Sequence, residues 1–412
     1  MVTVIMAGGK GTRISSIAND IPKPMILIEG KPVLEHEILC LKNQGLKDII
    51  ITVSHLGQTI IDYFGDGSRF GVNIEYYFEK EPLGNAGALF KIKDKLTDTF
   101  LLLNGDAIFD IDFNRFIKYH KEKGALVTLF THPNSHPYDS GLIITDKESR
   151  VVNWLTKEDN RPNWYKNRVN AGLHVVDKKV LDLRIETPKI DLDRQILKPL
   201  SGTGKMFAYD SPEYVKDMGT PERYYKVIED FKNGIVKSRN LSNKQKAIFL
   251  DRDGTLNKYV GFLTDIDDLE LIEGTSKAIK KINESKYLAI VITNQPVVAR
   301  GEVTFEELDE IHNKLETLLG KDGAYLDAIY YCPHHPHSGY KGEVKELKID
   351  CDCRKPKPGL IFQAAKDFNI DLANSFMIGD SESDILCGNN AGCHSIIVND
   401  KNKLLDIIER IL

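Results

Sequence analysis

The sequence predicts an α/β protein with two domains. At 412 residues the chain is longer than a single domain normally is. In both halves, short apolar runs alternate with amphipathic stretches, which is the pattern of parallel sheets flanked by helices. Residues 237–246 (KSRNLSNKQK) carry a single large apolar side chain, and this composition is typical of a linker. We therefore expect domains at 1–236 and 247–412, joined by that linker.

The strands and helices of the first half can be placed from apolar runs and end signals. Strands are expected at 2–6, 49–53, 74–78 and 100–103. A helix is expected over 32–44, closed by Gly45, and a second one over 221–233 after a Thr-Pro start.

The second half follows the same alternation. Strands are expected at 247–250, 288–292, 328–331 and 376–378. A helix is expected over 305–319, opened by Thr304 and ended by Gly320. Ligands of such folds bind just beyond the carboxyl ends of the strands, so the residues that follow each strand are the functional candidates.

Composition and charge limit the class of partner. Hydrophobic residues make up 42% of the chain and charged residues 28%, as in ordinary globular proteins. The net charge of −5 gives no reason to expect a nucleic acid or a membrane as partner. The first residues lack a secretion signal, and six cysteines in so long a chain are no disulfide framework. We expect a cytoplasmic enzyme that acts on small molecules, either as a monomer or as a homo-oligomer.

A glycine-rich loop, GGKGTR at 8–13, follows the first strand directly. Its glycines let the backbone approach an anion, and its lysine and arginine add positive charge. It is neither a Walker loop, because Lys10 precedes Gly11, nor a dinucleotide fingerprint, because Ile14 occupies the place of the third glycine. Alone, the loop fits a plain tight turn equally well. Further segments accompany it: PKP at 22–24, PLGNAGAL at 82–89, NGD at 104–106 and VKDMGTP at 215–221.

In this order the segments resemble the sugar-1-phosphate nucleotidyltransferase family, over residues 1–234. The resemblance implies a Rossmann-like fold with a mixed sheet. It also implies transfer of a nucleotidyl group from a nucleoside triphosphate to a sugar 1-phosphate, with release of pyrophosphate. Such a reaction depends mainly on alignment and charge neutralisation. By resemblance, Mg²⁺ is held by Asp106 and Asp217.

The same resemblance assigns the substrate contacts of the first half. Arg13 and Lys23 correspond to the cations that hold the phosphates and are the catalytic candidates. The nucleotide-binding candidates are Gly8, Gly9, Gly11, Thr12, Leu83, Gly84 and Asp106. The sugar-contacting candidates are Asn170 and Gly172, with Lys157. The family's Phe-x-Glu-Lys segment reads WLTK at 154–157 here, so its glutamate is replaced by Thr156.

In the second half, FLDRDGTL at 249–256 places two aspartates at the exit of a strand. Residues two apart on a strand point the same way, so Asp251 and Asp253 can share a metal ion. ITN at 292–294, RKP at 354–356 and IGDS at 378–381 follow. Together these segments resemble the four motifs of the haloacid-dehalogenase superfamily of phosphotransferases, across residues 247–412. This resemblance implies a doubly wound parallel sheet.

The superfamily's chemistry gives each matching residue a role. Asp251 is the nucleophile that forms an aspartyl-phosphate, and Asp253 is the general acid and base. Asp380 completes a Mg²⁺ site with these two, while Asp384 either supports that site or belongs only to its helix. The phosphate- and substrate-binding candidates are Thr293, Asn294, Arg354 and Lys355.

Three cysteines and a histidine form a candidate zinc site: Cys332, His334, Cys351 and Cys353. Thiolate and imidazole ligands at this spacing suit a closed tetrahedral zinc, and His335 and His337 are expected to be surface residues. The same layout occurs in the heptose bisphosphate and histidinol-phosphate phosphatase branch, which implies a structural ion. After Asn294-Gln295 that branch usually has Ser-Gly, whereas this chain has Pro296-Val297.

The two resemblances together imply a bifunctional enzyme of nucleotide-activated heptose synthesis. It would remove the 7-phosphate of D-glycero-D-manno-heptose 1,7-bisphosphate and then transfer GMP from GTP to the heptose 1-phosphate. Two alternatives remain open. The phosphatase half could act on histidinol phosphate beside another sugar nucleotidyltransferase, or one half could be an inactive nucleotide sensor.

Overall fold

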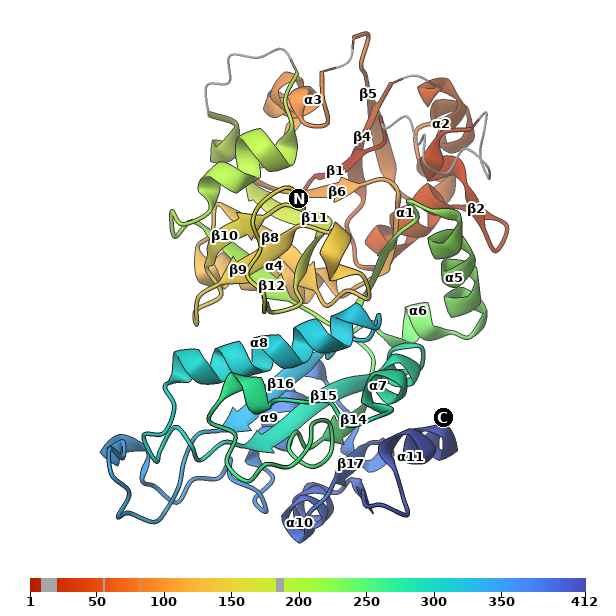
Figure 1. The fold of residues 1–412 in the computed structure, drawn as a ribbon. Helices are drawn as coiled ribbons and strands as arrows, with labels where there is room; N and C mark the ends of the chain where they lie inside the picture. The colour runs from red at the N-terminus through yellow and green to blue at the C-terminus, as the bar shows by residue number, and fades with distance from the viewer. Residues whose placement is uncertain (9–20, 55, 82, 183–188) are drawn as a thin grey trace. The chain divides into compact units, whose positions relative to one another are not determined.

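The computed structural model of the protein describes residues 1–8, 21–54, 56–81, 83–182 and 189–412 (Figure 1). These residues form two compact units. The N-terminal unit comprises 1–132, 141–156 and 169–240, and the C-terminal unit comprises 133–140, 157–168 and 241–412. Two short segments from the first half of the sequence therefore pack with the C-terminal unit. The domain boundaries at 236 and 247 stay a prediction.

The N-terminal unit contains a mixed sheet, as expected. Strands β1 (Thr3–Met6), β4 (Asp48–Val53), β5 (Asn73–Phe78) and β6 (Thr99–Asn104) run parallel, in the order β6-β1-β4-β5. The sheet continues through antiparallel β11 (Val169–Asp177), which pairs with β8 (Val127–His132) and β9 (Leu142–Thr145). β10 (Val151–Leu155) pairs with β9, and β12 (Met206–Asp210) pairs with β8. The four expected strands are confirmed to within a residue at each end.

Alternation along the strands divides the core of this unit between the two faces of the sheet. Ile5 of β1 faces a cluster with helices α1 (Val33–Asn43), α2 (Gly57–Phe64) and α4 (Phe113–Lys123), whereas its neighbour Val4 faces the opposite cluster. That second cluster includes residues of α3 (Gly87–Lys91) and of the turn of helix at Leu192–Leu197. Since successive strand side chains point to opposite faces, this alternation is what buries the sheet on both sides.

The N-terminal unit also contains a small two-stranded sheet, formed by one strand from the middle of its sequence and one near its end. β7 (Ala107–Asp110) pairs with β13 (Tyr214–Asp217), and α5 (Pro221–Lys232) follows with Thr220 as its N-cap. A further short helix, α6 (Ile235–Ser238), occupies the beginning of the expected linker. Within that linker Arg239, Asn240, Leu241 and Gln245 are buried, so the segment is folded against the protein.

The C-terminal unit is built on a parallel sheet of five strands in the order β16-β15-β14-β17-β18. Their bounds are β14 (Lys246–Leu250), β15 (Tyr287–Asn294), β16 (Ala328–Cys332), β17 (Phe376–Gly379) and β18 (His394–Ile397). The chain starts in the middle, builds outward to β16 and returns to the other side of β14. This confirms the doubly wound parallel sheet. Because β14 and β17 lie side by side while their connections leave in opposite directions, a crevice is expected at their carboxyl ends.

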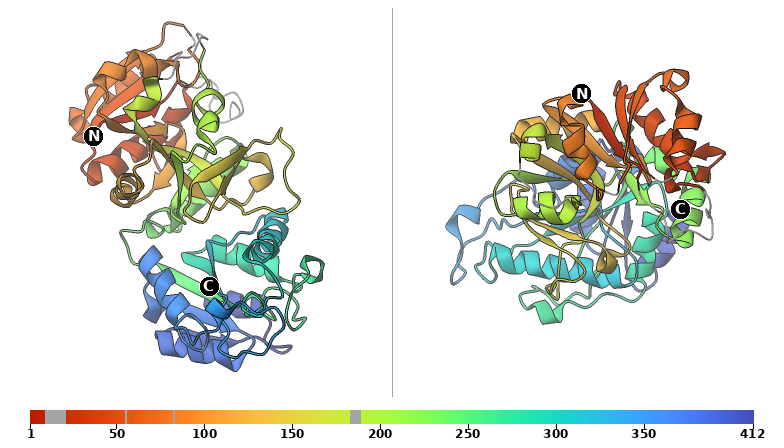
Figure 2. Two further views of the ribbon diagram at one scale, coloured as in Figure 1. Left: turned by 90° about the vertical axis from the view of Figure 1, so that its left-hand side faces the viewer. Right: turned by 90° about the horizontal axis from the view of Figure 1, so that it is seen from above.

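Helices cover both faces of this sheet (Figures 1 and 2). Ile248 and Leu250 pack in a cluster with α7 (Thr275–Asn283), α8 (Phe305–Lys321) and α11 (Leu404–Ile411). Ala247 and Phe249 pack on the other side with α9 (Gly359–Phe368) and α10 (Glu382–Ala391). Every helix in the described part of the chain is too short or too polar to cross a bilayer.

Helix α8 begins as expected but does not end as expected. Thr304 and Glu307 form a capping box at its start, so this boundary is confirmed. Gly320 does not terminate the helix, which continues through Lys321. A Cβ atom at Gly320 would lie 3.1 Å from Cγ of Pro137. The glycine therefore permits close packing inside the last turn of the helix, and its sequence signal was misread as a stop.

Candidate active sites

In the N-terminal unit, the pairing of β7 with β13 brings together two aspartates that are far apart in the sequence. Asp217 lies opposite Ala107, so it stands beside Asp106, the residue that precedes β7. Lys23 Nζ lies 2.5 Å from the carboxylate of Asp106. Three charged candidates of the sequence analysis thus meet at one place.

Arg223 is a member of this site that the sequence analysis missed. Its Nη1 lies 2.8 and 2.9 Å from the two oxygens of Asp217, which also accepts a hydrogen bond of 2.8 Å from the backbone N–H of Gly219. Burial opposes ionisation of Asp217, but the Arg223 guanidinium outweighs it, and the pKa of Asp217 is lowered. The available signal was the position of Arg223 in the first turn of a helix that starts just after the aspartate.

The nucleotide-binding candidates are only partly described. Ser54 Oγ donates a hydrogen bond of 2.7 Å to the carbonyl of Gly8. The carbonyl of Leu83 accepts one of 2.8 Å from Ile190 N–H, and a Cβ at Gly84, whose φ is +82°, would lie 2.3 Å from the carbonyl oxygen of Ile190. Only glycine fits that turn. Gly9, Gly11, Thr12 and Arg13 lie outside the described residues.

The sugar-contacting candidates of β11 lie at an irregularity of that strand. The register of β11 against β8 shifts between Asn170 and His174, and Gly172 has a φ of +75°. A Cβ at Gly172 would lie 2.3 Å from Nδ2 of Asn104. His174 was missed by the sequence analysis: its Nε2 lies 3.1 Å from Oδ1 of Asn170, and burial lowers its pKa to about 4, so the ring is neutral. It holds the amide of Asn170 in place.

Lys157, the third sugar-contacting candidate, does not belong to the N-terminal unit. It lies in an exposed turn after β10 and belongs to residues 157–168 of the C-terminal unit. Thr156, which replaces the glutamate of the family's segment, ends the preceding stretch of the N-terminal unit.

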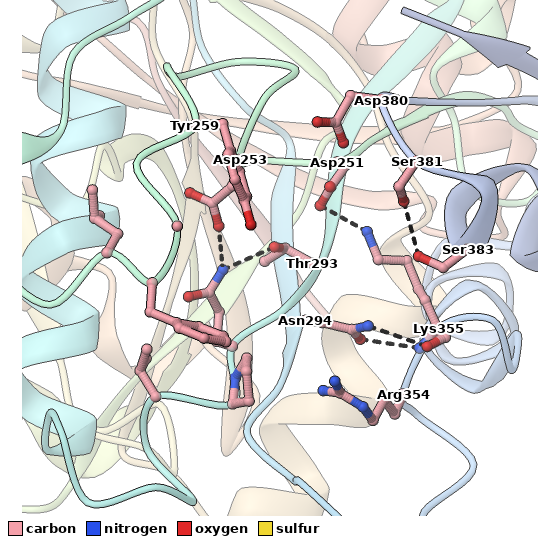
Figure 3. A pocket seen from close by; sticks show the side chains of 16 residues that line it. Asp251, Asp253, Tyr259, Thr293, Asn294, Arg354, Lys355, Asp380, Ser381 and Ser383 are labelled. Atoms are coloured by element: carbon pink, nitrogen blue, oxygen red, sulfur yellow. Dashed lines mark hydrogen bonds and ion pairs between the residues drawn. The ribbon is translucent and has the colours of Figure 1, made fainter.

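In the C-terminal unit, the carboxyl ends of β14, β15 and β17 surround a cavity of about 300 Å³ (Figure 3). The expected nucleophile Asp251 follows β14 and Asp380 follows β17. All candidates that the sequence analysis assigned to phosphate transfer line this cavity: Asp251, Asp253, Thr293, Asn294, Arg354, Lys355 and Asp380. The topology of the sheet therefore assembles them at the expected crevice.

Lys355 lines this cavity and pairs with two carboxylates. Its Nζ lies 2.7 Å from Oδ1 of Asp251 and 2.5 Å from Oδ1 of Asp384, and its side chain is 2% exposed. Burial favours the neutral amine, but the two carboxylates outweigh it and raise the pKa of Lys355. Burial raises the pKa of Asp251 to about 6, against the lowering effect of Lys355.

Asp384 makes contacts that suit both of the tasks that the sequence left open. Its Oδ2 accepts hydrogen bonds from the N–H and Oγ of Ser381, which begins α10, while its Oδ1 faces Lys355. Single carboxylate oxygens of Asp251, Asp380 and Asp384 all lie within 4.8 Å of one another. Such a set of hard oxygen donors fits Mg²⁺.

Asp253, which the sequence analysis also assigned to the Mg²⁺ site, is not in this group of three carboxylates; its role as a metal ligand stays a prediction. Other side chains bind it. Arg252 Nη2 lies 2.8 Å from its Oδ2, and Gln295 Nε2 donates to the same oxygen at 2.9 Å. Arg252 is fully buried and also donates to Nε2 of His312 at 3.2 Å. Burial, and then Arg252, hold the pKa of His312 well below its usual value. The sequence analysis missed this positioning of Asp253.

Asn294 and Arg354 connect the phosphate-binding lysine to the loop of the zinc candidate. Oδ1 of Asn294 accepts from the backbone N–H of Lys355 at 3.0 Å, and its Nδ2 donates to the carbonyl of Lys355 at 3.2 Å. Arg354 Nη1 donates to the carbonyl of His334 at 3.2 Å. Downstream of Asn294, Val297 is buried in a small apolar cluster with Val303 and Leu308. The departure from Ser-Gly at 296–297 thus adds core contacts beside the cavity.

The four zinc candidates converge as the sequence predicts. The sulfur atoms of Cys332, Cys351 and Cys353 lie 3.1 to 3.4 Å apart. Nδ1 of His334 lies 3.7 Å from Cys332 Sγ and 3.2 Å from Cys353 Sγ. A tetrahedron with Zn–S distances of about 2.3 Å has edges of roughly 3.8 Å, so the sulfur atoms would move apart by a few tenths of an ångström around a zinc ion. Three thiols and one imidazole nitrogen are a donor set that suits zinc.

The two neighbouring histidines differ from each other. His337 is exposed, as expected, but His335 is buried, so its assignment to the surface was wrong. Its Nδ1 accepts a hydrogen bond of 3.2 Å from the backbone N–H of His337. The ring fills the loop and is not part of the four-ligand group.

The folds and the two sites define a chain that joins a nucleotidyltransferase to a phosphatase of the haloacid-dehalogenase type. The nucleotidyl transferase family model matches residues 2–234, and the HAD-hydrolase-like model matches residues 352–404. The chain therefore belongs to the nucleotidyl transferase family and, in its C-terminal part, to the family of HAD-like heptose-1,7-bisphosphate 7-phosphatases.

Individual relatives match one half of the chain each. The mannose-1-phosphate guanylyltransferase of Mycobacterium tuberculosis is 33% identical over 57% of this chain, which spans 66% of that protein. The D-glycero-beta-D-manno-heptose-1,7-bisphosphate 7-phosphatase of Haemophilus ducreyi is 45% identical over 36% of this chain and 79% of that protein. Among solved structures, HddC from Yersinia pseudotuberculosis matches with 28% identity and a TM-score of 0.49, covering 56% of this chain and 99% of that one.

Proposed function

We propose that the protein is a bifunctional enzyme of nucleotide-activated heptose synthesis. The C-terminal unit removes the 7-phosphate of D-glycero-D-manno-heptose 1,7-bisphosphate. The N-terminal unit then transfers GMP from GTP to the heptose 1-phosphate, which releases pyrophosphate and gives GDP-D-glycero-α-D-manno-heptose. The observation that carries this proposal is the fusion itself. A relative of a heptose bisphosphate phosphatase is covalently joined to a sugar-1-phosphate transferase, so the product of one reaction belongs to the substrate class of the other.

The C-terminal cavity supports a two-step hydrolysis. A carboxylate oxygen of Asp251 attacks the 7-phosphorus and forms an aspartyl-phosphate, while the bond to the sugar oxygen breaks and Asp253 protonates that oxygen. Asp253 then takes a proton from the water that cleaves the aspartyl-phosphate. Lys355, 2.7 Å from Asp251, neutralises charge on the phosphoryl oxygens. Mg²⁺, held by Asp251, Asp380 and Asp384, would supply further charge neutralisation.

The N-terminal site supports nucleotidyl transfer by charge neutralisation. The adjacent carboxylates of Asp106 and Asp217 are of the type that holds a Mg²⁺-bound triphosphate, and Lys23 lies where it can pair with a phosphate oxygen. Asn170, held by His174, is offered as a hydrogen-bonding group for the sugar. The choice of GTP follows the guanylyltransferase relative, although a uridylyltransferase of Synechocystis is 34% identical.

The two alternatives are less well supported. A histidinol-phosphate phosphatase would give the fusion no shared intermediate, and the 45% identical relative is named for a heptose bisphosphate. An inactive sensor would not need the buried contact of Lys355 with Asp251, nor the contact of Lys23 with Asp106. The contact of Lys355 with Asp251 is buried, and a buried ion pair is costly to keep without a charged substrate.

The test is one assay with two readouts. The purified protein is incubated with Mg²⁺ and the α- or the β-anomer of the heptose 1,7-bisphosphate, each with GTP, ATP, CTP or UTP in turn. Inorganic phosphate and pyrophosphate are followed separately. Phosphate release with every nucleotide is expected, and pyrophosphate release is expected with the α-anomer and GTP alone. Phosphate release without pyrophosphate under all conditions would reject the coupled function, and a preference for another nucleotide would reject GTP.

We further expect one tightly bound zinc ion per chain, whose loss weakens the phosphatase. In Cys351→Ser with Cys353→Ser two of the four ligands are removed, and the loop that carries Arg354 and Lys355 loses its anchor. Phosphate release should fall roughly tenfold or more, while nucleotidyl transfer to supplied heptose 1-phosphate persists. Zinc is measured by elemental analysis, and both reactions are measured on the same preparation.

His337→Ala is the matched control for this zinc prediction, since the side chain of His337 is exposed and stands outside the ligand group. It should keep both the zinc and the phosphatase activity. A wild-type protein prepared without chelator that contains no zinc would rule out the site. Full phosphatase activity in the zinc-free double variant would rule out the link to Lys355.

A further inference from the structure

Part of the rim of the phosphatase cavity is an exposed loop in the connection that follows β14. Tyr259, labelled in Figure 3, and Phe262 belong to this loop and line the cavity. The two residues are 70% and 51% exposed. Residues exposed to this extent touch fewer neighbours than core residues do. Phe262 therefore needs a contact from another segment if its ring is to keep one position at the rim.

Arg300 supplies that contact. Its guanidinium carbon lies 3.9 Å from the ring centre of Phe262 and 4.4 Å from the ring centre of Tyr340. Its Nη2 lies 2.6 Å from Oε1 of Glu302, and the Arg300 side chain is only 15% exposed. A planar guanidinium can lie over aromatic rings and still donate to a carboxylate at its edge, which the compact ammonium of a lysine does less well.

Tyr340 belongs to residues 335–350, here termed the zinc loop because this segment lies between the histidine and the second cysteine of the zinc candidates. Its ring is also held by Lys348, whose ammonium lies 4.5 Å from the ring centre. The backbone next to Arg300 approaches the same loop closely. A Cβ at Gly301, whose φ is +70°, would lie 1.8 Å from the carbonyl oxygen of Gly342, so only glycine permits this approach.

The position of Phe262 in the cavity indicates which part of a substrate it can meet. The reacting phosphate is expected at Asp251 and Lys355, and both of these residues are buried. The rest of the substrate must then extend toward the exposed part of the cavity, where Phe262 lies. Arg300 contacts Phe262 but is not itself one of the described residues that line the cavity. It can therefore influence the non-reacting part of the substrate through Phe262.

We propose that Arg300 is a positioning residue for binding of the sugar part of the phosphatase substrate. By contacting Phe262 and Tyr340 together, its guanidinium fixes the rim loop against the zinc loop and gives the sugar a rigid surface to bind. This inference rests on the proposed phosphatase function. It assigns to Arg300 a role in substrate binding that is separate from phosphoryl transfer.

The test uses the full chain and three variants. Arg300→Lys keeps the charge but loses the planar group, and Tyr340→Leu removes the ring on the zinc loop. Lys341→Gln is the matched control, because Lys341 is an exposed residue next to Tyr340. For each variant, KM and kcat of phosphate release from the heptose 1,7-bisphosphate are measured. The inhibition constant of orthovanadate, a phosphate mimic without a sugar, and the zinc content are measured on the same preparation.

Arg300→Lys and Tyr340→Leu should each raise the KM for the heptose bisphosphate roughly tenfold, because displaced substrate contacts weaken binding steeply. Since neither substitution touches Asp251 or Lys355, kcat and the inhibition constant of orthovanadate should stay within about twofold of wild type. Zinc content should not change, and Lys341→Gln should match wild type throughout.

A merely structural role would give a different pattern. An unchanged KM in Arg300→Lys overturns the proposal. An equal weakening of sugar and orthovanadate binding, or loss of zinc from the variant, overturns it too, because the effect would then reach the whole site. If Arg300→Lys does not fold, Tyr340→Leu decides alone by the same criteria.

Wild-type activity separates the two possible failures. If the unmodified protein releases no phosphate from the heptose bisphosphate, the proposed function fails and this inference fails with it. If the unmodified protein is active and the folded variants keep its KM, only the positioning role of Arg300 is wrong.

Discussion

Asp251→Asn is expected to abolish phosphate release from the heptose bisphosphate while nucleotidyl transfer to supplied heptose 1-phosphate continues. The asparagine amide cannot attack phosphorus, so the aspartyl-phosphate does not form and the rate should fall by about four orders of magnitude or more. The substitution also removes one of the two carboxylates that face Lys355, the other being Asp384. Phosphate release and pyrophosphate release, followed separately, measure the two reactions.

Asp400→Asn is the control for this substitution, since Asp400 is an exposed residue of the same unit. It should change neither reaction. Phosphate release within a factor of ten of wild type in Asp251→Asn would exclude Asp251 as the nucleophile. Loss of both reactions in a variant with an unchanged circular dichroism spectrum would show that the two sites depend on each other.

Asp106→Ala should have the converse effect and remove nucleotidyl transfer alone. Its carboxylate lies beside Asp217 and 2.5 Å from Lys23, so its loss leaves the half-buried Lys23 without this partner and the triphosphate site without one of its charges. A fall of roughly three orders of magnitude in pyrophosphate release is expected, by analogy with the loss of other charge-stabilising groups. Phosphate release from the bisphosphate should remain as in wild type.

Asp94→Ala, which removes an exposed carboxylate of the same unit, serves as the control for Asp106→Ala. Asp106→Asn keeps the shape and removes only the charge. If Asp106→Asn retained most of the transfer activity, the charge would not matter, and a metal-holding role for Asp106 would be untenable.

These two substitutions also define how far the halves are independent. The residues proposed for bond making and breaking do not overlap between the two sites, so each chemical step should survive the loss of the other. The two variants therefore test whether each site can carry out its chemistry without the other.

Local sequence patterns were sufficient to predict most strands and helices of the fold. In β14, alternate residues face opposite apolar clusters, and this is why an uninterrupted apolar run was correctly interpreted as a strand of a sheet flanked by helices. Thr304 with Glu307 identified the start of α8, since a capping box is made within one helical turn. The end of α8 was wrongly predicted at Gly320. That glycine is required for close packing against Pro137, a residue distant in the sequence, and does not end the helix.

The partners of the site residues could not be predicted in the same way. Arg252 was passed over between two aspartates, yet it is fully buried and binds Asp253 together with Gln295 from β15's carboxyl end. Arg223 and His174 likewise act on residues that the sequence had singled out, Asp217 and Asn170. Each of these contacts depends on the direction of a side chain in the folded molecule, and residue type alone does not contain that direction.

The sequence by itself determined the two kinds of chemistry, because the glycine-rich loop, the NGD segment, the paired aspartates at 251 and 253 and the Cys/His group are properties of short stretches. It also determined the parallel sheet of the C-terminal half through the alternation of apolar runs with amphipathic stretches. Only the tertiary structure brought Asp217 beside Asp106, because that contact follows from the antiparallel register of β13 with β7. Only the tertiary structure placed residues 157–168 on α8. The buried ion pair between Arg168 and Glu316 forms only when two segments that are distant in the sequence are buried against each other.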